Sequence, residues 1–220
     1  MRQEVEARGK KLEDDMRRIT KNLGFNIVIL PKDQNLSDLF AADYADKYMP
    51  ESYAKTLADS SIVTVNHLLP SLEQRIQWPE RDGRTMILIG IKGEVPIAHR
   101  DPKKPLLDPV PPGKIILGAE LARTEQLKVD DEVTLMGQAF HVSTVYPPRG
   151  DKRDITAWID LKQAQRLLDK PAMINAIWAL ECKCAFGDLP KIRKEIEAIL
   201  PQTQVIEKGT IALARAEARQ

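Results

Sequence analysis

The stretch that most constrains the fold runs from residue 114 to residue 146. An apolar run over 115–117 is followed by a short amphipathic segment over 119–127 and by two alternating runs around Met136 and Gly137. Glycine accommodates the positive φ that a tight hairpin turn requires. The pattern therefore predicts strand, short helix, strand, turn and strand. Strands this short usually close into a small barrel or sandwich, because closure removes exposed edges.

A proline-rich segment separates this stretch from the residues before it. Prolines recur so densely through residues 96–114 that they prevent regular structure and stiffen the chain. After residue 146 we expect a polar loop over 147–154, a strand over 155–159 and a helix over 161–168. Residues 96–169 are therefore predicted to form a small β-rich unit inserted into a larger domain.

The flank before the insertion, residues 25–95, contains continuous apolar runs and also segments whose apolar residues recur at helical spacing. Its first run is nearly continuous, as in a strand covered on both faces, and a helix with a proline at its start follows. The expected elements are a strand over 25–30, a helix from Pro50 with Tyr53 and Leu57 facing inward, a strand over 62–69, and a hairpin of 72–78 with 85–91.

The flank after the insertion, residues 170–208, predicts a strand over 173–183, a helix over 189–200 and a closing strand over 204–206. Asp188 is a suitable N-cap for that helix. Joined across the insertion, the two flanks have the order of a split βαβ, ferredoxin-like layer. The predicted class is therefore α+β, with helices on a mixed sheet.

Both ends of the chain predict charged helices, over 1–24 and 209–220. Each has only a narrow apolar stripe, so it can pack one edge against another helix but cannot form a core. We expect the two helices to pair as a stalk, although ordinary solvated terminal helices would give the same pattern. The residues expected to make the pairing are Val5, Leu12, Met16, Ile19 and Leu213.

Composition excludes several classes of protein. The chain has 220 residues, 43% of them apolar and 30% charged, which is a globular composition rather than a disordered one. A formal net charge of +1 provides no field that favours nucleic acid as a partner. No run approaches the roughly 20 apolar residues that a membrane span needs.

The sequence shows no recognisable arrangement of catalytic residues. The sequence contains no nucleophile elbow, no zinc-binding helix motif and no phosphate-binding glycine loop. Cys182 and Cys184 lie at i and i+2 of a strand-like run, where they are too far apart to bridge without distortion. We therefore expect no enzyme activity and no cofactor or metal in this chain.

An aromatic group in the first flank is the one candidate ligand surface. It consists of Phe40, Tyr44, Tyr48 and Tyr53. The first three recur at helical spacing, which favours a helix that packs on the sheet. The alternative is that the tyrosines line a groove between the barrel and the sheet.

Three segments together resemble a known family. They are LGFNIVILPKDQNL after a charged helix, ILGAELARTEQLKVDDEVTLMGQAFHV in the inserted unit, and the terminal ARAEAR. This order resembles the extracytoplasmic domain of MacB/FtsX-like ABC transporter permeases. The resemblance covers residues 21–219 and implies a porter-type mixed sheet interrupted by a small β-rich, Sabre-like unit, located between two transmembrane helices.

The resemblance implies a function in transport without catalysis. The domain would lie on the extracytoplasmic (periplasmic) side of the membrane and pass ATP-driven motion to a lipoprotein, peptide, amphiphile or regulated protein. ATP would be used by a separate cytoplasmic ABC ATPase, and a second permease copy or paralogue would face this one. The alternative function is a freestanding soluble protein that binds a ligand in the cleft between barrel and sheet.

Overall fold

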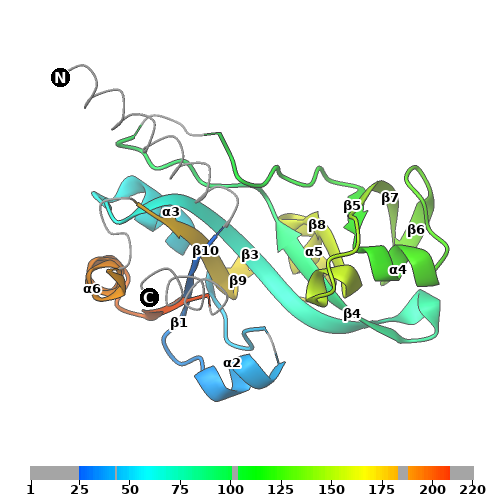
Figure 1. The fold of residues 1–220 in the computed structure, drawn as a ribbon, viewed down its shortest axis with the longest axis horizontal. Helices are drawn as coiled ribbons and strands as arrows, with labels where there is room; N and C mark the ends of the chain where they lie inside the picture. Colours follow the sequence, from blue (N-terminus) through cyan, green and yellow to red (C-terminus); the bar gives the residue numbers. More distant parts are fainter. Residues whose placement is uncertain (1–24, 43, 101–103, 183–187, 209–220) are drawn as a thin grey trace, which may run out of the picture.

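The computed structural model describes residues 25–42, 44–100, 104–182 and 188–208, and these fold around one nine-stranded sheet (Figure 1). Parallel pairs join β4 to β8 and β5 to β7, and the other neighbours are antiparallel. In spatial order the strands are β11 (Thr203–Glu207), β1 (Ile27–Pro31), β10 (Ala176–Glu181), β3 (Val65–Trp78), β4 (Arg84–Ile91), β8 (Thr156–Asp160), β5 (Lys114–Leu117), β7 (Gln138–Val145) and β6 (Glu132–Leu135).

One half of the sheet has the predicted ferredoxin-like order. Strands β11, β1, β10 and β3 lie side by side and are antiparallel throughout. Helices α3 (Ser52–Asp59) and α6 (Leu189–Ile199) connect them and pack on the same core, through Leu57 and Ile192 among others. The split βαβ arrangement and the mixed α+β class predicted from the sequence are therefore confirmed.

The other half contains the strands of the predicted insertion, β8, β5, β7 and β6. Helix α4 (Ala119–Thr124) follows β5, and β6 and β7 form a hairpin whose turn holds Met136 and Gly137 at φ 51° and 79°. The predicted succession of strand, helix, strand, turn and strand is confirmed. Helix α5 (Leu161–Leu167) follows β8, as expected.

The short strands do not close into a separate barrel by backbone pairing, contrary to expectation. Instead β8 pairs with β4, so the strands of the insertion extend the larger sheet. Side chains from the tip of the β3–β4 hairpin reach the far edge at β6. The indole nitrogen of Trp78 donates to the carbonyl of Thr134 at 2.8 Å, and the Glu80 carboxylate accepts from the backbone of Gly137 at 2.6 Å.

The sheet buries both of its faces. One face packs against α3, α4, α5 and α6 in the main core. The opposite face is covered in two places: α2 (Leu36–Ala42) lies over β1 and β10, and the proline-rich segment lies over β3, β4 and β8 through Leu107 and Val110. Strand β1 is buried along its whole length, which confirms a strand covered on both faces.

Strand β3 is one continuous strand of 14 residues, whereas the sequence predicted two strands separated near Pro70. Pro70 is tolerated because it lies just beyond the β3–β4 ladder, which begins at Ser71. On that side of β3 the carbonyl of Leu68 accepts from the backbone of Val95 and not from β4. The N–H that proline lacks therefore has no ladder partner to lose.

The predicted strand over 173–183 is interrupted. Met173–Ile174 forms β9, which pairs with β2 (Met49–Pro50) in a separate two-stranded sheet. The interruption falls at Asn175, a fully buried residue whose side-chain amide donates to the carbonyls of Ala45 and Glu73, both at 2.6 Å. These bonds hold the chain at the junction between the two sheets. Two short helical turns, η1 (Pro79–Arg81) and η2 (Lys152–Ile155), complete the described elements.

Candidate functional site

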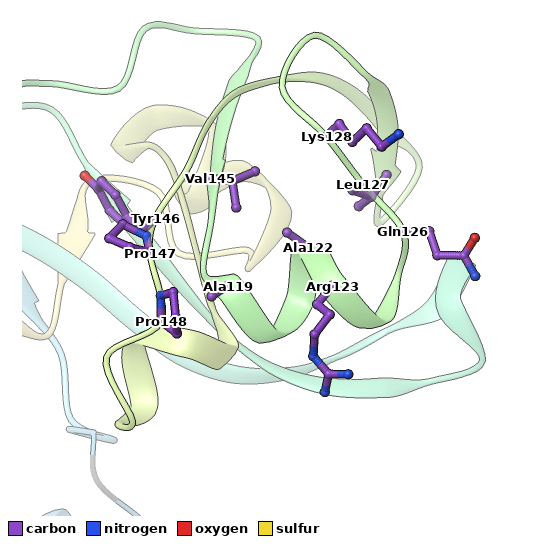
Figure 2. Close-up of a pocket in the computed structure, with 10 residues that line it drawn as sticks. All are labelled: Ala119, Ala122, Arg123, Gln126, Leu127, Lys128, Val145, Tyr146, Pro147 and Pro148. Carbon is purple, nitrogen blue, oxygen red and sulfur yellow. The ribbon is translucent and has the colours of Figure 1, made fainter.

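A shallow, open groove lies on the inserted unit (Figure 2). Its volume is about 710 Å³, and it is open to solvent along its length. Helix α4 forms one wall and the segment that follows β7 forms the other (Figure 2). The first wall presents Ala119, Ala122 and Arg123 from one face of the helix, since residues three and four apart lie together.

A glycine fixes where this helix begins. Gly118 precedes α4, and a Cβ at this position would lie 2.1 Å from the carbonyl oxygen of Arg153 and 2.6 Å from that of Asp154. Any larger residue would force the backbone apart. The N–H of Gly118 also donates to the carbonyl of Thr156 at 2.8 Å. The start of α4 is therefore held directly against η2.

The end of α4 turns back into the core. Gln126 has a left-handed φ of 56°, and the N–H of Leu127 then donates to the carbonyl of Ala122 at 2.9 Å. This turn buries the Leu127 side chain and leaves Gln126 and Lys128 at one end of the groove.

The second wall consists of Val145, Tyr146, Pro147 and Pro148. The N–H of Tyr146 donates to the carbonyl of Leu117 at 2.9 Å, which continues the pairing of β7 with β5 by one residue. The Tyr146 ring lies edge-on to Trp158, with 5.2 Å between ring centroids. Burial raises the pKa of the Tyr146 phenol, so this residue is neutral at physiological pH.

The groove has an apolar floor, and two basic residues lie at its edge. Arg123 and Lys128 carry positive charge at its edge, and no carboxylate lines it. The Arg123 guanidinium is held by Glu120 on the same exposed helix face, with a 2.7 Å contact. Because this pair is exposed, it orients the arginine without burying it.

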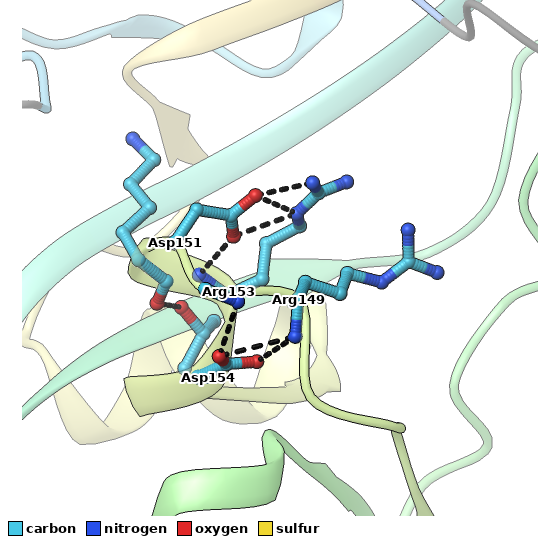
Figure 3. Close-up of polar contacts among 7 residues, drawn as sticks. Arg149, Asp151, Arg153 and Asp154 are labelled. Carbon is cyan, nitrogen blue, oxygen red and sulfur yellow. Dashed lines mark hydrogen bonds and ion pairs between the residues drawn. The ribbon is translucent and has the colours of Figure 1, made fainter.

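The loop that leaves the second wall is held by its own carboxylates (Figure 3). Asp154 accepts from the backbone N–H groups of Arg149 and Gly150 at 2.9 and 2.8 Å. Asp151 caps η2 and pairs with the guanidinium of Arg153, and this hydrogen bonding lowers the pKa of the Asp151 carboxyl to about 2. The charged loop predicted from the sequence is therefore solvent-exposed but internally bonded.

The structure does not gather the four predicted aromatic residues on one open surface. Phe40 lies on α2 and is 70% exposed, whereas Tyr48 and Tyr53 pack against the main core. The ammonium group of Lys170 lies 4.9 Å from the centre of the Tyr48 ring, and burial raises the pKa of this phenol. Tyr44 is half-buried near Tyr48. A ligand surface formed by these residues stays a prediction.

The predicted stalk residues Val5, Leu12, Met16, Ile19 and Leu213 lie outside the described residues, as does Cys184. The N–H of Cys182 donates to the carbonyl of Thr64. Within the described ranges, no three His, Cys, Asp or Glu side chains come together in a way that could hold a metal ion. Among the helices of those ranges, none has the length and apolar character needed to span a bilayer.

Sequence reasoning missed the groove. Its two walls come from residues 119–128 and 145–148, and nothing in the hydrophobic pattern of either segment indicates a concave surface. Two local signals were available. Gly118 immediately before a helix indicates a close approach of backbone, and consecutive prolines after a strand mark a segment that cannot continue a ladder.

The solved structures that resemble this chain include two extracytoplasmic domains. The periplasmic region of MacB from Actinobacillus actinomycetemcomitans matches with a TM-score of 0.56 and 11% identity, over 88% of this chain and 94% of that one. The extracellular domain of the noncanonic ABC-type transporter YknZ from Gram-positive bacteria matches with a TM-score of 0.50 and 13% identity, over 83% and 98%.

No protein-family model matches the sequence, and neither does any curated protein. At the identities of the two solved domains, the likeness is one of fold. The predicted resemblance to the extracytoplasmic domain of a MacB-like permease is confirmed at that level.

Proposed function

We propose that this chain is the extracytoplasmic domain of an ABC transporter permease and that it transmits motion rather than catalysing a reaction. The likeness to the MacB and YknZ domains over most of the chain supports the general kind of protein. Transmission of motion needs a stiff body with both connections at one place. Two features of the described residues support the proposal: the side-by-side position of the two chain ends and the polar contacts between the two halves of the sheet.

The observation that carries the proposal is the pairing of the first and last strands. Ile27 at the start of β1 lies opposite Glu207 at the end of β11. The N–H of Lys208 then donates to the carbonyl of Asn26 at 2.9 Å, one step beyond the ladder. The chain therefore enters and leaves the domain side by side, so two flanking helices could move the domain as one body.

The body itself is tied together across its two halves. Glu51 at the start of α3 is only 9% exposed, and its carboxylate accepts from Lys92, from Lys162 at 2.8 Å and from Gln165 at 2.9 Å. These donors belong to the segment after β4 and to α5. Helix α5 also packs closely on β4, because a Cβ at Gly90 would lie 2.3 Å from that of Ala164.

The remaining parts of the proposal follow from the kind of protein. The domain lies on the extracytoplasmic side, a cytoplasmic ABC ATPase uses the ATP, and a second permease copy or paralogue faces this one. An extracytoplasmic substrate or adaptor protein receives the motion. The chain itself needs no cofactor and performs no catalysis under this proposal.

Disulfide crosslinking in the full-length permease with its ATPase tests the proposal. After Cys182 and Cys184 are replaced by serine, Leu12→Cys with Leu213→Cys should crosslink readily, and the yield should change when ATP is bound. The matched control is Asp14→Cys with Leu213→Cys, since Asp14 lies off the predicted apolar stripe. Equal yields for both pairs, or no response to ATP, would contradict the proposal.

The freestanding ligand-binding alternative placed its site in a cleft between barrel and sheet. The groove beside α4 is instead lined entirely by residues of the inserted unit, from Ala119 to Pro148. This groove is therefore not the cleft that the alternative expects.

A further inference from the structure

We propose that Trp178 is a positioning residue that fixes both ends of the described chain to the sheet. The segments before Phe25 and after Lys208 then move together with the body of the domain. This role deepens the proposed transmission of motion and rests on it for its purpose, whereas the contacts at Trp178 are independent of that proposal.

Strand β10, which contains Trp178, holds the N-terminal connection. Asn26 is buried just before β1, and its N–H donates to the carbonyl of Ala179 at 3.1 Å. Its side-chain oxygen accepts from the N–H of Glu181 at 3.0 Å. Phe25 packs against the buried cluster that includes Leu69 on β3. The chain therefore enters the domain fastened to β10 by Asn26 and to the neighbouring strand by an aromatic side chain.

The C-terminal connection reaches the same strand. The ammonium group of Lys208 lies 5.1 Å from the centre of the Trp178 ring, which is the distance of a cation–π contact. Lys208 follows the last residue of β11, and β1 lies between β11 and β10. Its side chain therefore reaches across β1 to Trp178, so the contact joins the end of the chain to a strand with which β11 does not pair.

Trp178 is itself held in a fixed position between the two connections. It lies opposite Val28 on β1 and opposite Leu69 on β3. It packs against both clusters on this face of the sheet, the one under α2 and the one under the proline-rich segment. Its indole N–H donates to the hydroxyl of Ser71 at 3.1 Å and to the carboxylate of Glu73 at 3.0 Å. These bonds to β3 fix the orientation of the ring.

Motion that enters at Trp178 has a continuous route to the inserted unit. Strand β10 pairs with β3, and β3 runs for 14 residues, which is about 45 Å at the rise of an extended strand. At its far end the Trp78 indole donates to the carbonyl of Thr134 on β6. A fixed seat at Trp178 therefore lets the flanking segments move both halves of the sheet. A loose seat would let those segments bend where they meet the domain without moving it.

Distances between spin labels on the whole 220-residue chain test the proposal. Cys182 and Cys184 are first replaced by serine. One labelled pair is Glu13→Cys with Lys114→Cys, and the second is Glu217→Cys with Lys114→Cys, since Lys114 is exposed at the start of β5. Double electron–electron resonance measures the width of each distance distribution, which reports how freely a flanking segment moves relative to the body. We expect both distributions to be narrow when Trp178 is present.

Three variants and a control separate this role from general stability. Trp178→Leu should broaden both distributions about twofold or more, because both segments lose their common contact. Phe25→Ala should broaden chiefly the first distribution and Lys208→Ala chiefly the second, and these two variants carry the test should Trp178→Leu fail to fold. Trp78→Phe is the control. It also removes an indole hydrogen bond, at the far end of β3, and should lower the thermal unfolding midpoint while leaving both widths unchanged.

Several results would overturn the proposal. These are distributions that are already as broad with Trp178 present as in Trp178→Leu, equal broadening by Trp78→Phe, and unchanged widths in both Phe25→Ala and Lys208→Ala. Broadening that follows the loss of unfolding midpoint across all variants would also overturn it, since the role would then be purely structural. The measurement needs no ATP. A stalk that responds to ATP while the widths ignore Trp178 contradicts this inference alone, and the reverse result contradicts the proposed function alone.

Discussion

Replacing Glu51 by glutamine should destabilise the domain far more than the loss of an exposed carboxylate does. The Glu51 carboxylate is buried, with Lys92, Lys162 and Gln165 as its donors. The lysine side chains are 39% and 57% exposed, so water screens part of the attraction. We expect a loss of about 2 kcal/mol in the free energy of unfolding at pH 7, which lowers the unfolding midpoint by about 4 to 8 °C.

The same substitution makes the stability depend differently on pH. Burial raises the pKa of the Glu51 carboxyl, but the hydrogen bonds from Lys162, Lys92 and Gln165 outweigh it and lower the pKa to about 2. A carboxyl with a depressed pKa stabilises the fold above its unfolded value of 4.5, and this contribution is lost as the pH falls toward 2. The difference between the wild type and Glu51→Gln should therefore shrink from about pH 5 to about pH 2.

Urea unfolding of both proteins across this pH range measures the difference. Glu197→Gln is the matched control, because Glu197 is an exposed glutamate on α6 and its replacement should change stability by less than about 0.5 kcal/mol. A Glu51→Gln protein as stable as the wild type at pH 7 would refute the reasoning. A difference that stays constant with pH would refute it as well.

Three further substitutions test the packing by urea unfolding. Gly118→Ala should cost about 2 kcal/mol or more, because its Cβ would lie 2.1 Å from a backbone oxygen, whereas Gly83→Ala, with a φ of 68° and open space, should cost only about 1 kcal/mol. Trp78→Phe should cost about 1 to 2 kcal/mol and speed hydrogen exchange in β6, because Thr134 loses its donor. Asn175→Ala should cost about 3 kcal/mol, and a smaller loss than at Trp78 would contradict its role at the sheet junction.

Elements with strong local signals were predictable from the sequence. Alternating apolar residues on either side of Met136 and Gly137 located the β6–β7 hairpin in the sequence. In the structure both turn residues adopt positive φ, as a tight hairpin turn requires. Asp188 was expected to cap α6, and its side chain accepts from the N–H of Lys191 at 3.0 Å. In each case the residues that give the sequence signal are within a few positions of the residues that form the turn or cap. Contacts with distant segments therefore did not override the local preference.

Features that depend on distant contacts were not predictable. Asn175 interrupts a strand only because the carbonyls of Ala45 and Glu73 are brought to it from other segments. Likewise β6 is joined to the β3–β4 hairpin by the hydrogen bond from the Trp78 indole to the carbonyl of Thr134, and these residues are 56 positions apart in the chain. The groove belongs to the same class, since its two walls meet only when β5 and β7 pair. Periodicity reports local burial and carries no information on these partners.

The gene on either side of this sequence provides the most direct test of the central claim, that the chain is the extracytoplasmic domain of a permease. The claim predicts one apolar run of about 20 residues ahead of Met1, and two or more such runs after Gln220, in a single reading frame. Reading the flanking DNA is sufficient to measure this. A stop codon directly after Gln220, with no apolar run upstream, would contradict the claim and favour a freestanding binding protein.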